Sequence, residues 1–167
     1  MSCLGVLFAL TKQDVESLLE IKDEEQRLDM LKDVIEEKYF DEYPEYTAEF
    51  DKSWDAIHRV MTDGYFDLNN GTFPLSHVIM GGQSLYEDDD YFMILKTPEE
   101  VELIWQALQG VTEEWFRERY FMIDSEDYGF DVDEDDFRYS WQWFCYSLPA
   151  WELAAKEKRY MLFTVDQ

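Results

Sequence analysis

The sequence contains few cysteines and histidines, the residues that form the disulfide bonds and zinc sites of many small proteins. Its 167 residues include two cysteines, Cys3 and Cys145, and two histidines, His58 and His77. The cysteines are far apart and show no CxxC or zinc-type spacing, so they indicate neither a disulfide framework nor a zinc site. With 46% apolar residues the chain can bury a core without disulfide bonds or bound metal. We expect one domain, residues 1–167, in a reducing, cytoplasmic setting.

Long apolar runs and export signals are also missing. The first ten residues are mostly apolar, but they lack the basic region and the small-residue cleavage site of a signal peptide. No segment approaches the roughly 18 uninterrupted apolar residues that cross a bilayer. The sequence therefore predicts a cytoplasmic protein with no membrane association.

Basic residues are few, and this gives the chain its strongest compositional signal. Fourteen Lys and Arg stand against 39 Asp and Glu, a net charge of −25. A magnitude of about 2 to 8 is enough for solubility. Such a negative surface disfavours direct binding to nucleic acid or anionic membranes and attracts basic partners. Because 17% of the residues are aromatic, the charge belongs to a folded body and not to a disordered tail.

Apolar patterns predict strands at both ends of the chain and mostly helices between them. Residues 1–10, 91–96 and 160–166 have the composition of strands. Thr97-Pro98-Glu99-Glu100 is a capping box with proline at the first helical position, and it predicts a helix that ends at Gly110. We expect an α+β fold in which a small sheet, including paired N- and C-terminal strands, packs against several helices.

Three segments have weaker patterns. Residues 39–50 are rich in aromatics without a clean period and are interpreted as a connector. Residues 74–80 fit one or two helical turns, with a short strand as the alternative. In the helix predicted over 135–158, Pro149 removes a backbone donor and should kink or split the helix.

The first block with possible chemistry is DKSWDAIH, residues 51–58. On a helix, Trp54 and Asp55 could both lie against His58. His58 is then either a general base or binding-site imidazole, or a histidine that flanks the core and bonds to a neighbour. If His58 is accessible, Asp55 should favour its protonated form, which would work against a role as a base.

The second block is PLSHVIMGGQSL, residues 74–85. Adjacent side chains diverge on a helix, so we expect no dyad between Ser76 and His77, whereas Ser76 with His58 stays geometrically possible. The block has no GxSxG elbow, and Gly81-Gly82 has no phosphate-binding pattern. The two histidines lack HExxH or HxD spacing, so we predict no metal and no cofactor.

The acidic segment DSEDYGFDVDEDD, residues 124–136, resembles a calcium loop only superficially. Gly129 would occupy the sixth position of such a loop, but Tyr128 would occupy a ligand position, which excludes an EF-hand. The segment is either a solvated loop leading into a helix or a surface for a basic partner. The carboxylates that would form this partner-binding surface are Asp124, Glu126, Asp127, Asp131, Asp133, Glu134, Asp135 and Asp136.

The chain resembles the YfbM-like family of small bacterial proteins of unknown function. The resemblance rests on CLGVLFAL, DKSWDAIH, PLSHVIMGGQSL, YFMILKTPEEV and a terminal helix followed by a strand. It implies a compact α+β domain and brings no activity, cofactor or catalytic residue. The matching positions are Asp51, Lys52, Ser53, Trp54 and His58 in the first block and Pro74, Leu75, Ser76, Gly81 and Gly82 in the second.

Two classes of function remain open at the level of sequence. The first is a non-enzymatic, cytosolic bacterial module of the immunity or inhibitor type, which binds a basic protein; a DNA mimic would be a special case with carboxylates at phosphate-like spacing. The alternative is a hydrolase or transferase with a pocket around Asp51, Trp54, His58, Ser76 and His77.

Overall fold

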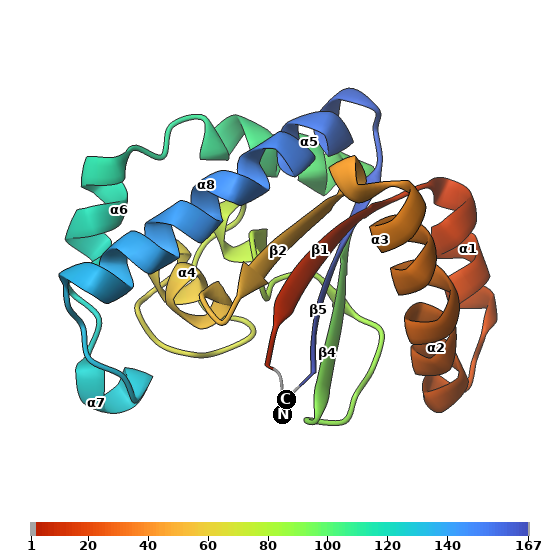
Figure 1. Cartoon of the computed structure of the whole chain (residues 1–167), viewed down its shortest axis with the longest axis horizontal. Helices are drawn as coiled ribbons and strands as arrows, with labels where there is room; N and C mark the ends of the chain where they lie inside the picture. The colour runs from red at the N-terminus through yellow and green to blue at the C-terminus, as the bar shows by residue number, and fades with distance from the viewer. Residues whose placement is uncertain (1–2, 167) are drawn as a thin grey trace.

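The computed structural model describes residues 3–166, which form an antiparallel five-stranded sheet with helices on both faces (Figure 1). The strand order is β2-β1-β5-β4-β3. The strands are β1 (Gly5–Leu10), β2 (Thr47–Asp51), β3 (Gln83–Ser84), β4 (Tyr91–Lys96) and β5 (Tyr160–Asp166). The terminal strands pair with each other, in a register that sets Val6 opposite Thr164 and Leu10 opposite Tyr160. This confirms the predicted α+β class.

One face of the sheet is covered by the first helices of the chain, which Figure 1 shows together in red and orange. They are α1 (Lys12–Glu20), α2 (Glu24–Met30), the π-helical segment η1 (Leu31–Glu36) and α3 (Glu37–Glu42). Because successive strand residues point to opposite faces, Phe8, Leu10 and Leu162 pack with Leu18 and Leu31 in this core layer.

The other face is covered by α4 (Trp54–Met61), α5 (Pro98–Leu108), α6 (Glu113–Tyr120) and the long α8 (Glu134–Lys156). Leu7 and Phe163 point into this layer and pack with Trp151 of α8. The predicted capping box is confirmed: Glu100 N donates to Thr97 Oγ1 at 3.3 Å, and Thr97 N donates to Glu100 Oε1 at 2.9 Å. The short elements η2 (Pro44–Tyr46), η3 (Leu75–His77) and α7 (Ser125–Tyr128) connect these helices and strands.

The interpretation of residues 39–50 as a connector is wrong. The segment contains the end of α3, the 3₁₀ turn η2 and strand β2, which pairs with β1. Within β2, Ala48 and Phe50 are buried and Glu49 is exposed, which is the alternation of a strand. The alternation spans so few residues that the surrounding aromatics obscured it in the sequence.

Two further expectations are settled by the backbone. The helix around Pro149 is not split, since α8 runs continuously from Glu134 to Lys156 and Pro149 lies on its exposed side. Residues 74–80 contain the 3₁₀ turn η3, so the helical alternative holds and the strand alternative is wrong. The strand β3 begins only at Gln83.

Candidate functional site

The first block forms the corner between β2 and α4. Asp51 has a positive φ of 52°, which turns the chain at the end of the strand. Ser53 is fully buried, and its hydroxyl donates to the carbonyl of Phe50 at 2.6 Å. The indole N–H of Trp54 donates to the carbonyl of Cys3 at 2.9 Å, which connects the corner to the start of β1. These residues therefore have architectural roles in this corner.

Lys52 lies on the outer side of the same corner. Its side chain is exposed, whereas its backbone N–H donates to the hydroxyl of Tyr139 on α8 at 3.0 Å. The corner is thus joined both to the N-terminal strand and to the longest helix.

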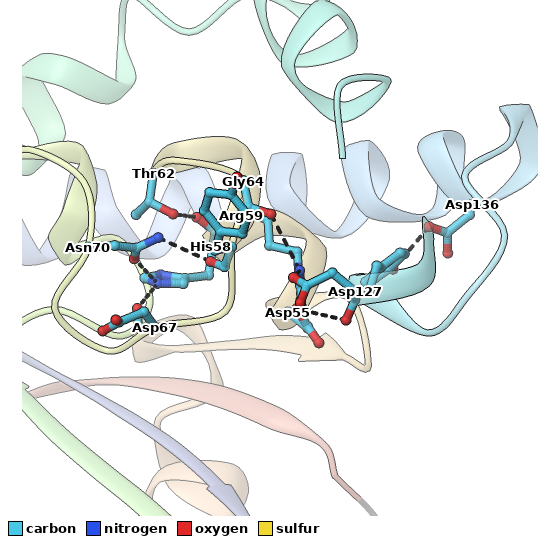
Figure 2. Close-up of polar contacts among 11 residues, drawn as sticks. Asp55, His58, Arg59, Thr62, Gly64, Asp67, Asn70, Asp127 and Asp136 are labelled. Carbon is cyan, nitrogen blue, oxygen red and sulfur yellow. Dashed lines mark hydrogen bonds and ion pairs between the residues drawn. The ribbon is translucent and has the colours of Figure 1, made fainter. Parts of the chain in front are cut away.

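His58 is fully buried in α4 (Figure 2). Its Nε2 lies 2.7 Å from the carbonyl oxygen of Asp67 and 3.0 Å from Oδ1 of Asn70. Both partners accept, so they fit a ring that carries its proton on Nε2. Burial lowers the pKa of His58, although these two acceptors oppose the shift. The expectation that Asp55 would favour a protonated His58 does not apply, because Asp55 bonds instead to Arg59.

The expectation that Ser76 and His77 cannot interact is wrong. Ser76 Oγ lies 2.9 Å from His77 Nδ1, because the two residues sit in the 3₁₀ turn η3 and not in an α-helix. On the other side of the ring, His77 Nε2 lies 3.3 Å from Glu100 Oε2. Burial lowers the pKa of His77 against the opposing effect of Glu100. A neutral ring can thus accept from the Ser76 hydroxyl at Nδ1 and donate to Glu100 from Nε2.

A buried lysine, Lys96, acts on the histidines of both blocks. Lys96 on β4 is fully buried and donates to the carbonyl of Ile79 at 2.5 Å. Its charge acts on both His58 and His77 and lowers the pKa of each. Ser76 is 7% exposed and His58 is not exposed at all. Of the residues in the predicted pocket, Trp54, His58 and Ser76 are buried, and Asp51 and His77 are partly exposed.

Arg59 follows His58 and is the centre of a second network (Figure 2). Its side chain is 4% exposed and donates to Asp55 at 2.6 Å and to Asp127 at 2.5 Å. It also donates to the carbonyl of Gly64 at 3.3 Å and lies 5.4 Å from the centre of the Tyr128 ring. Arg59 thereby holds α7 and the loop after α4 against the same helix.

A surface hollow of about 400 Å³ lies beside this network. It is lined by Arg59, Thr62, Asp63, Gly64, Tyr65, Arg119 and Met122. Arg119 donates to the carbonyls of Val60 and Thr62 and stacks on Trp115 at 4.8 Å. At the rim, Tyr65 is 63% exposed and Met122 is 81% exposed. Large apolar side chains exposed beside a hollow are typical of protein-binding surfaces.

The acidic segment reaches this hollow at Asp127, which contacts Arg59, but most of its carboxylates have partners within the protein. Five of the eight predicted residues accept hydrogen bonds: Asp124 and Asp133 from backbone N–H groups at helix starts, Asp127 from Arg59, Glu134 from Arg117, and Asp136 from Tyr120 and Tyr128. The exposed carboxylates of Glu126, Asp131 and Asp135 have no such partner among the described residues. These three are the ones most available to another molecule.

Residues 3–166 contain neither a candidate metal site nor a candidate membrane-spanning helix. No group of three or more histidine, cysteine, aspartate or glutamate side chains could hold a metal ion. No helix in this range has the length and apolar character to cross a membrane. Cys3 and Cys145 are both free thiols.

The chain matches the sequence model of a known protein family. The family model described as a domain of unknown function, DUF1877, matches residues 1–164. The chain belongs to this family. Among solved structures, it is similar to the crystal structure of YfbM, a protein of unknown function from Escherichia coli, with a TM-score of 0.67 and 17% identity. The match covers 97% of this chain and 99% of YfbM, and it confirms the predicted resemblance. No curated protein matches.

Several residues at the candidate site of this DUF1877 protein were missed from sequence. Glu100 was recognised as part of a capping box, but its second oxygen also contacts His77. Arg59 directly follows His58, and a cation in so acidic a chain could have indicated a buried ion pair. Tyr65, Arg119 and Met122 come from segments far apart in sequence, and no local pattern predicts that they surround one hollow.

Proposed function

We propose that the protein is a single-domain, cytosolic bacterial interaction module that binds a basic protein, as an immunity or inhibitor protein would. The observation that supports this most is the pairing of exposed Tyr65 and Met122 at a hollow with the acidic segment next to it. Tyrosine and methionine are enriched in interfaces, and a ring of charge around an apolar centre gives specificity.

Electrostatic attraction would act before the two proteins come into contact. The net charge of −25 would draw a basic partner in, with a screening length of about 8 Å at physiological salt. Glu126, Asp131 and Asp135 would contact the basic side chains of the partner. Tyr65 and Met122 would form the desolvated, apolar centre of the interface.

The experiment uses the full chain as immobilised bait in a bacterial lysate, followed by titration calorimetry with the purified candidate partner at low and high salt. The triple variant Glu126→Gln, Asp131→Asn, Asp135→Asn should weaken binding, and high salt should weaken it in the same direction. The matched control removes three exposed carboxylates from the opposite layer: Glu20→Gln, Asp29→Asn, Asp41→Asn. Equal losses in both triple variants would contradict a local acidic site.

The apolar half of the surface has its own test. Tyr65→Ala with Met122→Ala should reduce affinity by about thirtyfold or more, because a single hot-spot side chain contributes about 2 kcal/mol or more. Tyr146→Ala, which truncates an exposed aromatic on α8, is the control and should leave affinity unchanged. If no partner with salt-weakened binding is found, the proposal fails.

A second candidate is a hydrolase or transferase, favoured by the chain of contacts from Ser76 through His77 to Glu100. Substrate access would require movement of Phe73, whose ring stands edge-on to His77 at 4.9 Å. A fluorophosphonate probe that labels active serines tests this candidate: it should label the native chain and not Ser76→Ala. Absence of labelling in the native chain would exclude a nucleophilic Ser76.

A further inference from the structure

A second cavity lies on the opposite face of the sheet and has no part in the proposed partner surface. It is a cleft of about 270 Å³ between the π-helical segment η1 and the sheet, at the end where β1 and β4 begin and β5 ends. In Figure 1, η1 lies between α2 and α3. Among the lining residues, those that carry chemistry are Lys32, Glu36, Phe40, Glu49, Tyr91 and Asp166.

The π-helical segment positions two of these side chains. Leu31 and Ile35 are buried in the core, and Lys32 and Glu36, each one residue later, line the cleft. Phe40 continues the same wall into α3. Six consecutive residues in π-helical geometry are uncommon, and such geometry often occurs at functional sites.

The polar groups of the cleft pair with one another only through long contacts. Tyr91 Oη lies 3.4 Å from Glu36 Oε1, and Lys32 Nζ lies 3.9 Å from Asp166 Oδ2. Both distances exceed the roughly 2.7 to 2.9 Å of a strong hydrogen bond or ion pair. Lys32 Nζ also lies 5.1 Å from the centre of the Tyr91 ring. A ligand in the cleft could therefore replace these weak contacts with shorter ones.

The balance of charge in the cleft selects the sign of a ligand. Three carboxylates, from Glu36, Glu49 and Asp166, face one ammonium group, that of Lys32. Burial raises the pKa of Glu36, with Lys32 and Tyr91 opposing the shift, so an added cation would favour its ionised form. The rings of Tyr91, 3% exposed, and Phe40, 39% exposed, line the cleft, and such rings attract cations and pack on apolar stems.

We propose that this cleft binds an alkylammonium group, with Glu36 as its carboxylate partner and the Tyr91 and Phe40 rings beside its apolar stem. Lys32, 43% exposed and loosely paired, is the internal competitor for the same carboxylates. The ammonium could belong to a free diamine or to a lysine side chain of a peptide, which present the same chemistry. This site goes beyond the proposed partner surface and does not depend on it.

The test is titration calorimetry of the full chain with pentane-1,5-diamine, at constant ionic strength, with pentan-1-ol as the uncharged comparison. The diamine should bind and the alcohol should not. Glu36→Gln, which keeps the shape of the side chain, should lower the affinity by about tenfold, the loss expected for one charge-assisted contact. Glu37→Gln removes the same charge from an exposed neighbour that does not line the cleft, and it should change little.

The variant Lys32→Gln distinguishes an ammonium ligand from a zwitterionic or anionic ligand, because the two should respond to it in opposite directions. Removing the competing cation should raise the affinity for the diamine several-fold, whereas a zwitterionic or anionic ligand would lose affinity. No binding of any amine, equal effects of Glu36→Gln and Glu37→Gln, or weaker binding by Lys32→Gln would each overturn the proposal.

A parallel titration with Nα-acetyl-lysine amide distinguishes the two sources of the ammonium. Binding of both probes supports the shared chemistry, and binding of the lysine amide alone assigns the cleft to a peptide side chain. Far-UV circular dichroism of each variant checks that the fold is retained. Failure here would leave the partner surface unaffected, because that surface is tested with different residues in the other layer.

Discussion

The side-chain nitrogen of Lys96 lies 2.5 Å from the carbonyl oxygen of Ile79 and is fully buried. An ammonium group has three N–H donors, and a buried charge with one acceptor is unfavourable. Burial accordingly lowers the pKa of Lys96 from 10.5 to about 7, with Glu100 opposing the shift. The amine is thus about half protonated near pH 7, and its charged form lowers the pKa of both His58 and His77.

The first prediction concerns stability against pH. Between pH 7 and 10.5 the unfolded chain binds more protons at Lys96 than the folded chain does, so stability should rise with pH across this window. Lys96→Met should flatten the rise and stabilise the protein at pH 7 by on the order of a few kcal/mol. Thermal unfolding over this range measures both effects. Lys156→Met, at an exposed position, is the control, and a slope that persists in Lys96→Met would contradict the assignment.

The second prediction compares a buried with an exposed arginine. Arg59→Met should lower the free energy of unfolding by about 3 to 5 kcal/mol, because it leaves the carboxylate of Asp55 buried without its partner. Arg117→Met, which breaks an ion pair with Glu134 at a 44% exposed side chain, should cost less than about 1 kcal/mol. Urea denaturation of both variants measures these free energies of unfolding, and similar losses of stability would contradict the structural role of Arg59.

The third prediction concerns the glycines of the second block. A Cβ added at Gly82 would lie 2.5 Å from the carbonyl oxygen of Leu95, and the φ of Gly82 is +136°. Gly82→Ala should therefore destabilise the protein by more than about 1 kcal/mol. At Gly110 the nearest atom to an added Cβ lies 3.5 Å away, an ordinary contact. Gly110→Ala should stay within about 0.5 kcal/mol of the native protein in the same denaturation experiment.

The fourth prediction concerns protonation of the histidines. With two histidines in the chain, nitrogen-15 correlation spectra should show two ring systems, and His58→Gln would identify one of them. His58 should remain neutral and protonated at Nε2 below its ordinary pKa of 6.5, because burial disfavours its charged form. The unfolded chain binds the extra proton there, so the contribution of His58 to stability should fall as the pH drops below about 6.5. Titration of His58 at or above that value would contradict its buried environment.

Local patterns predicted the elements whose signals lie within one segment. The apolar run of β1, the capping box at Thr97 and the β-rich end of the chain all form the structures expected of them. Strand β2 was missed because Ala48, Glu49 and Phe50 give too short an alternation. The π-helical geometry of Leu31–Glu36 has no sequence signal comparable to a cap or a turn.

The site was harder to predict because its contacts join distant segments. Sequence identified His58 and His77, but not that the charge of Lys96 acts on both or that Glu100 reaches His77. The dyad of Ser76 and His77 was rejected because α-helical geometry was assumed for a segment that forms a 3₁₀ turn. The acidic segment was treated as one surface, whereas much of it caps helices or pairs with side chains that only the fold brings near.

The place of β5 between β1 and β4 has a consequence for how the protein is made. Each ladder that β5 forms joins residues synthesised late to residues synthesised much earlier, up to Val6 opposite Thr164. While the chain is still on the ribosome, β1 can pair only with β2, and β4 only with β3. The two halves of the sheet therefore stay apart until Tyr160–Asp166 emerges from the ribosome, and until then the newborn chain exposes the edges of β1 and β4 that β5 later covers.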